Sequence, residues 1–173
     1  ALHRDGWTAP AEIPIRSFDE LVGYLNDFNA DWVKAAKRLS PEIIIELLES
    51  TNEVVYEEFL KLDPFGVAAY SVSWAGESES FNWFDIAREY TERWLHQQQI
   101  RDAVNNSGLK TTELYQPFLN VFMQAWPHTL KDVKAGEGTV LKAVVTGIGD
   151  WYLHSGKDGW KLGNPGATKV MAE

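Results

Sequence analysis

The spacing of apolar and polar positions predicts a long helix early in the chain. Ser17 and Glu20 have the spacing of a capping box, in which a hydroxyl and a carboxylate satisfy free backbone N–H groups at a helix start. Apolar residues then recur at helical spacing: Leu21, Leu25, Phe28 and Trp32. We therefore expect a helix that extends to about Leu39.

A second helix is predicted directly behind the first. Ser40 can cap its N-terminus, and Pro41 fits the first helical position, where the missing N–H has no helical partner to lose. Strongly apolar positions follow: Ile43, Ile44, Leu47, Leu48, Val54, Val55 and Phe59. We expect this helix to end near Leu62, and residues 63–80, which are rich in Gly, Pro and Ser, to form a long loop.

Two further helices are expected in the middle of the chain. Asn82 is the predicted cap of a third helix that runs to about Asn105, with Gly108 near its C-terminal stop. Its expected packing face consists of Trp83, Phe84, Ile86, Ala87, Tyr90, Trp94 and Leu95. The fourth helix is predicted over residues 112–126, ended or kinked by Pro127.

After Gly136 the pattern changes from helical to extended. Residues 139–145 and 150–154 read as strands, and residues 157–159 are a plausible hairpin turn into 160–162. A last short strand is expected within 168–172. The predicted fold class is mainly α with a small β part (α+β), an up-down helical bundle followed by a short antiparallel sheet.

Composition and charge narrow the classes of partner. The chain has 173 residues and no cysteine, which excludes disulfides and Cys-based metal sites. Its net charge of −9 disfavours binding to phosphate backbones and anionic lipid, so we expect no nucleic-acid and no membrane partner. It shows no 18-residue apolar run and no signal-peptide pattern, and we expect a cytoplasmic protein. Eight tryptophans indicate a large aromatic core or a pocket for an organic ligand.

The polar face of the third helix, opposite its expected packing face, contains a candidate metal site. Glu92 and His96 are four residues apart, so their side chains project from adjacent turns toward one point. A carboxylate and an imidazole suit zinc, nickel, iron or manganese, although a solvated helix face is the plainer interpretation. A catalytic site usually has three protein ligands, and His3 is a weak third candidate. His128 and His154 fit structural or surface roles better.

Three other residues are candidates for binding a substrate. Arg93 could clamp a carboxylate, although an ion pair with Glu89 is the more ordinary role. Gln99 could orient a substrate from the same helix or simply lie at its surface. Trp74 begins a segment that could form a lid over the bundle, and a plain solvent loop is the alternative.

Residues 82–103 carry a family resemblance. The run from Glu92 to Arg101, with Glu-Arg-Trp-Leu-His-Gln-Gln-Gln-Ile-Arg, is its most specific part. The segments 62–65 and 72–77 and the later Gly159-Trp160 contribute as well. Together they resemble the DinB-like, mycothiol-dependent maleylpyruvate isomerase family.

The resemblance implies a metal-dependent enzyme of the thiol-dependent transferase or isomerase type. Residues 1–135 would form a DinB-like bundle without the expected first helix, and residues 136–173 a truncated sterol-carrier-like region. Glu92 and His96 would bind a divalent metal, zinc first and nickel or manganese next. The metal would activate water or an external low-molecular-weight thiol. The substrate would be a small molecule.

The chain also departs from the family pattern. In the family, a histidine from an earlier helix completes the metal site. Its equivalent would lie before Ala1, and the region after Gly138 is shorter than the family's last domain, so we expect a chain shortened at both ends relative to its relatives. A second copy could occupy the open position of the bundle, which predicts a homodimer. The alternative is a non-catalytic helical protein that has lost the metal site and serves to bind an apolar ligand or to dimerise.

Overall fold

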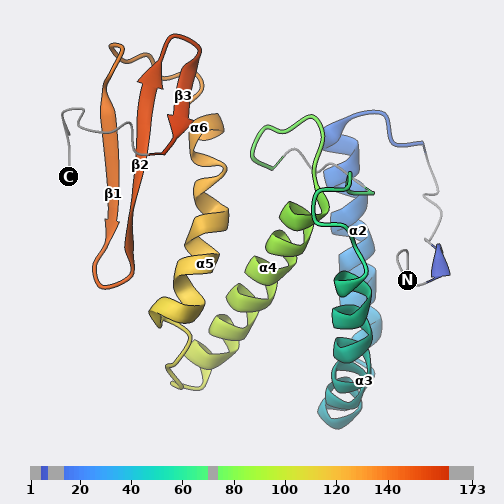
Figure 1. Cartoon of the computed structure of the whole chain (residues 1–173). Helices are drawn as coiled ribbons and strands as arrows, with labels where there is room; N and C mark the ends of the chain where they lie inside the picture. The colour runs from blue at the N-terminus through green and yellow to red at the C-terminus, as the bar shows by residue number, and fades with distance from the viewer. Residues whose placement is uncertain (1–4, 8–13, 70–73, 164–173) are drawn as a thin grey trace. The chain divides into compact units, whose positions relative to one another are not determined.

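Helices come first along the chain and a small antiparallel sheet follows, which confirms the α+β fold class (Figure 1). The computed structural model describes residues 5–7, 14–69 and 74–163. Its contacts divide the chain into two compact units, Ala1–Leu62 and Asp63–Glu173. The sequence-based domains 1–135 and 136–173 stay a prediction.

The first unit begins its long helix α2 (Phe18–Ala36) where the capping signal predicts. Ser17 Oγ accepts a hydrogen bond from the Glu20 amide at 3.2 Å. The Glu20 carboxylate accepts one from the Arg16 amide at 2.6 Å, one residue before the amide that a capping box normally uses. Two backbone N–H groups at the start of the helix are thus bonded to side chains, one to Ser17 and one to Glu20.

The second helix of this unit, α3 (Pro41–Leu60), also begins as predicted. Ser40 Oγ accepts from the Ile43 amide at 3.4 Å, and Pro41 occupies the first turn. None of the residues of α3 is buried in the described structure. Its exposed apolar side chains include Ile43, Ile45, Leu47 and Leu48. Among the described residues, no helix combines the length and apolarity of a membrane-spanning segment.

The sheet of the second unit consists of three antiparallel strands. They are β1 (Val140–Val145), β2 (Gly149–Gly156) and β3 (Gly159–Leu162), in the spatial order β1-β2-β3. Gly156 pairs with Gly159 across a two-residue turn, and Gly159 has a φ of +104°, which a residue without Cβ adopts at little cost. The predicted strands and hairpin are confirmed. The strand expected within 168–172 lies outside the described residues.

Within this unit, α5 (Thr112–Met123) lies between the sheet and α4 (Asn82–Ala103) (Figure 1). Trp151 on β2 donates its indole N–H to Asn120 Oδ1 on α5 at 2.8 Å. Trp160 on β3 donates to the Val133 carbonyl, beyond the short helix α6 (Trp126–Thr129), at 2.9 Å. These bonds satisfy the tryptophan donors while the rings are partly buried, and they attach the sheet to the helices.

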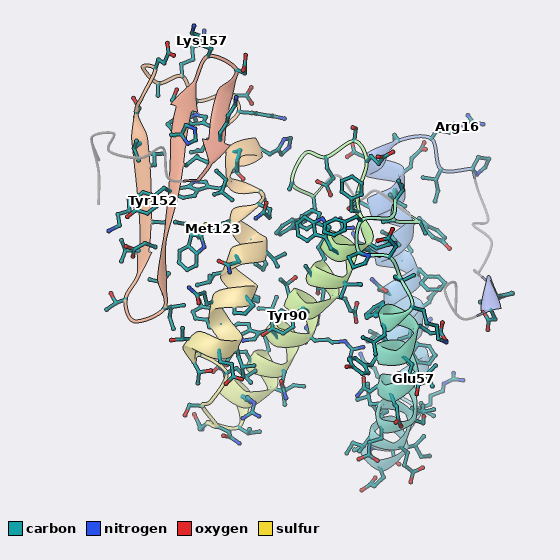
Figure 2. All side chains as sticks on the ribbon, in the orientation of Figure 1. Arg16, Glu57, Tyr90, Met123, Tyr152 and Lys157 are labelled. Atoms are coloured by element: carbon teal, nitrogen blue, oxygen red, sulfur yellow. The ribbon has the colours of Figure 1, made fainter. Side chains whose placement is uncertain are left out.

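An aromatic core joins α4 to α5. Trp94 of α4 stacks on Tyr115 of α5, with ring centroids 4.8 Å apart, and contacts Phe118 at 4.2 Å. Tyr90, on the same side of α4, donates its hydroxyl to the Leu114 carbonyl at 2.7 Å (Figure 2). Burial and the nearby Glu113 carboxylate raise the pKa of the Tyr90 phenol.

Two predicted helix boundaries require correction. Phe81, and not Asn82, is the N-cap of α4, and Asn82 instead donates its side-chain amide to the Asp63 carbonyl at 2.9 Å. The predicted helix over 112–126 ends at Met123, and Pro127 lies in the first turn of α6. Proline fits there because a first-turn N–H has no helical acceptor.

The predicted packing face of α4 is also wrong in part. Its buried residues are Asn82, Phe84, Thr91, Trp94 and Gln98. Trp83 and Leu95, which were expected to pack, are 40% and 37% exposed. Thr91 donates to the Arg88 carbonyl and the Gln98 amide nitrogen to Asp102, both at 2.7 Å, which offsets part of the cost of burying these side chains. Gln98 Oε1 is buried without a partner among the described residues.

Candidate functional site

The Glu92–His96 pair lies on the exposed side of α4. Their side chains are 64% and 65% exposed, and His96 Nε2 lies 3.4 Å from Glu92 Oε2. The four-residue spacing alone accounts for this proximity, because such side chains stand on adjacent turns. The structure thus brings these two candidate ligands together.

Gln99 contacts the other nitrogen of the same imidazole. Its Oε1 lies 3.0 Å from His96 Nδ1, and an amide oxygen can only accept, so the geometry assigns the proton to Nδ1. In the neutral ring the Nε2 lone pair then faces the Glu92 carboxylate. Two acceptors at this distance are stabilised by a shared cation, either a proton or a metal ion. A histidine that binds a metal usually donates its other ring N–H to an acceptor, and Gln99 Oε1 would serve as that acceptor here.

The remaining candidate residues do not join this pair. Arg93 Nε donates to Glu89 Oε1 at 2.9 Å, which is the ordinary ion pair expected from the spacing. Trp74 contacts Phe84, at 5.9 Å between ring centroids, and Phe84 precedes Glu92 by eight residues, or about 12 Å of helix rise. His3 lies outside the described residues. No group of three or more potential metal ligands occurs in the part of the chain that is described.

The other two histidines lie elsewhere in the second unit. His154 on β2 has its Nδ1 3.2 Å from the Gly163 carbonyl, which fits the structural role expected for it. His128 on α6 lies so close to Gly76 that a Cβ at Gly76 would overlap the imidazole ring. The loop and α6 therefore meet at this glycine.

A hollow near the start of α4 is a second candidate site, and the pattern of the sequence did not reveal it. It has a volume of about 240 Å³ and is open to solvent. Its wall combines loop residues, the start of α4 and one residue beyond α5: Ala75, Glu77, Glu79, Ser80, Phe81, Trp83, Phe84 and Gln124. The long loop predicted over residues 63–80 was a signal that this region could be functional. The sequence could not show that Gln124 lines the same hollow, because that depends on how α5 packs.

A charged network attaches the loop to α4 beside this hollow. Arg88 donates to Glu77 Oε1 at 3.2 Å and to Asp85 Oδ1 at 2.8 Å, and its guanidinium lies 5.1 Å from the centre of the Phe84 ring. Glu77 also accepts from the Ala75 amide at 2.7 Å. Because Arg88 is mostly buried, these bonds give the loop a defined position on the helix.

Gly76 supplies a test of that loop position. Its φ is +85°, and an alanine there would also overlap His128, so Gly76→Ala should destabilise the unit by about 1–2 kcal/mol from backbone strain plus a further steric cost. Gly159→Ala is the matched control, because Gly159 also has a positive φ but nothing within 4 Å of its Cβ position. Urea denaturation should show a larger loss of unfolding free energy for Gly76→Ala than for Gly159→Ala. Adding His128→Ala to the Gly76→Ala variant should remove the difference. Equal losses for both glycines would contradict the contact.

No protein-family model, no curated protein and no solved structure matches this chain.

Proposed function

We propose that the chain is a metal-dependent, DinB-like enzyme of the thiol-dependent transferase or isomerase type. In this proposal Glu92 and His96 are two ligands of one divalent cation, zinc first and nickel or manganese next. The observation that carries it is the 3.4 Å approach of Glu92 Oε2 to His96 Nε2, with Gln99 on the other imidazole nitrogen. That arrangement leaves an acceptor pair aimed at a shared cation.

The donor set fits such a metal in type and spacing, and two ligands come from the described residues. A third ligand would come from His3 or from a second copy of the chain. When bound, the metal would act as a Lewis acid that lowers the pKa of a coordinated water or external thiol. Gln99 orients His96, and the Glu92 carboxylate contributes negative charge. Arg93 follows Glu92 in the sequence and is ion-paired with Glu89, and in this proposal it would guide a substrate carboxylate.

The alternative is a non-catalytic binding or dimerisation protein, and one observation favours it. Apolar side chains of the first unit are exposed on both of its long helices, among them Phe28, Trp32, Ile45 and Leu48. The free energy of the system falls when an apolar ligand or a second copy of the chain covers such side chains. This function needs no metal.

Metal binding by His96 variants tests the proposal. Titration of the chain with zinc in a calorimeter should show about one equivalent bound per chain. His96→Ala and Glu92→Ala should each abolish that binding, because each removes one of the two ligands on α4. Gln99→Ala should weaken it by about 10- to 100-fold, as expected when a residue that orients a ligand is lost. The affinity for zinc should also fall as the pH decreases, since protons compete with the metal for His96 Nε2.

His128→Ala is the matched control, because it removes a histidine that contacts Gly76 instead of a carboxylate. It should bind zinc as the parent chain does. Zinc binding that survives both His96→Ala and Glu92→Ala would overturn the assignment. Absence of binding with excess zinc, nickel and manganese would remove the metal-dependent function and leave the alternative, for which sedimentation should then show a dimer.

A further inference from the structure

The hollow at the start of α4 has aromatic walls. Phe81, Trp83 and Phe84 line it, and Trp83 and Phe84 lie with ring centroids 5.2 Å apart. Trp74 contacts Phe84, with ring centroids 5.9 Å apart, and Phe122 of α5, with centroids 5.1 Å apart. Phe81 and Trp83 are about 40% exposed, so two ring surfaces remain open to a ligand. The faces of such rings carry negative potential and attract cations.

The charge beside these rings is also negative. Glu79 lines the hollow and makes no hydrogen bond or ion pair with the described residues. Arg88 bonds to both Glu77 and Asp85. Among the described residues around the hollow, these two carboxylates and Glu79 outnumber Arg88 and His128 taken together. The local electrostatic potential would therefore favour the binding of a cationic ligand.

The backbone at the same place offers little to an anion. Helix N-termini often bind anions through free amides, but the amides at the start of α4 are already bonded. Asn82 N donates to the Gly66 carbonyl and Trp83 N to the Pro64 carbonyl, both at 2.9 Å. Phe84 N and Asp85 N both donate to the Phe81 carbonyl. The helix start is therefore closed by the preceding loop.

One polar group in the wall lacks a partner. Ser80 is 2% exposed, and its hydroxyl has no hydrogen-bond partner in the described structure. An unpaired buried hydroxyl is costly. Its oxygen has almost no exposed surface, so a ligand N–H would satisfy it once the Ser80 side chain turns toward the hollow. Gln124 donates its amide nitrogen to the Asn120 carbonyl at 3.3 Å, so the remaining polar atom of that side chain is an acceptor. Both groups suit a ligand that donates hydrogen bonds.

We propose that this hollow binds a small organic ammonium ion with an apolar body. The apolar part would lie against Phe81 and Trp83, and the charged nitrogen would donate to Glu79 and Ser80. A volume of about 240 Å³ is smaller than the pockets that hold drug-sized molecules, which limits the ligand to roughly one ring with a short amine. This inference uses none of the residues of the Glu92–His96 pair, and it stands whether or not that pair binds a metal.

Benzylamine, benzyl alcohol and benzoate, which share a ring but differ in charge, are the probes for this proposal. Titrations followed by the indole N–H signals in two-dimensional NMR should show saturable shifts with benzylamine at pH 7, weaker shifts with benzyl alcohol, and none with benzoate. Glu79→Gln keeps the shape of the side chain and removes its charge, and should raise the Kd for benzylamine about fivefold. Glu53→Gln, an exposed carboxylate on α3, is the matched control and should leave the Kd unchanged.

Ser80→Ala provides a second, independent readout. Removal of a hydroxyl that has no partner should leave the free energy of unfolding unchanged or slightly higher, yet weaken benzylamine binding. Benzoate that binds as well as benzylamine, or a Kd that is the same in the parent chain and in Glu79→Gln, would overturn the proposal. Absence of saturable shifts with benzylamine would overturn it as well.

Discussion

Replacement of Trp94 by alanine is expected to destabilise the second unit by about 3–5 kcal/mol, the usual cost of removing a large buried aromatic side chain. Trp94 is 7% exposed and lies between Tyr115 and Phe118 in the core that joins α4 to α5. Its indole N–H also donates to the Leu109 carbonyl at 3.2 Å. The variant therefore loses apolar burial, ring packing and a hydrogen bond to the loop between the two helices.

Urea denaturation followed by near-ultraviolet circular dichroism measures this loss. Trp83→Ala is the control, since Trp83 lies on the same helix but is 40% exposed, and it should cost much less. Trp94→Phe should fall between the two, because it keeps a ring but leaves the Leu109 carbonyl without this donor. Equal stability of the two alanine variants would contradict the described core.

A second large effect is expected at Leu153, in the central strand of the sheet. Leu153 is fully buried and pairs with Leu141 on β1 and with Leu162 on β3. Leu153→Ala should destabilise the unit by about 2–5 kcal/mol, because the shorter side chain leaves a cavity between strands and helices. Amide hydrogen exchange should show loss of protection in all three strands together.

Val144→Ala is the comparison for this variant. Val144 lies on β1 and is 50% exposed, so its replacement should change stability by less than about 1 kcal/mol. If Leu153→Ala lowered stability no more than Val144→Ala, the sheet would not pack on α5 as described. Loss of protection confined to β3 would likewise contradict a sheet that unfolds as one piece.

Local physical chemistry explains which features of the fold were predictable. The starts of α2 and α3 follow from hydrogen bonds that Ser17 and Ser40 make to amides three residues later. The hairpin follows from two residues between paired glycines. The approach of Glu92 to His96 follows from helix geometry. Each of these interactions spans at most four residues, so the sequence order contains the required distance.

The tertiary structure decided the features that depend on distant segments. Periodicity placed Trp83 and Leu95 on the packing face of α4, but the buried stripe includes the polar Thr91 and Gln98 instead. Asn82 has the side chain of a helix cap, yet its amide bonds to Asp63 in the preceding loop. A single helix pattern cannot show which face a neighbour will cover, because that depends on the shape of both partners.

The sequence by itself therefore determined the helix starts, the hairpin and the pairing of Glu92 with His96, since these result from local hydrogen bonds and helical spacing. Only the tertiary structure decided which face of α4 is buried and where the aromatic hollow forms. The hollow adds Gln124 to the loop and the adjacent start of α4, and this distant residue reaches them because α4 packs against α5.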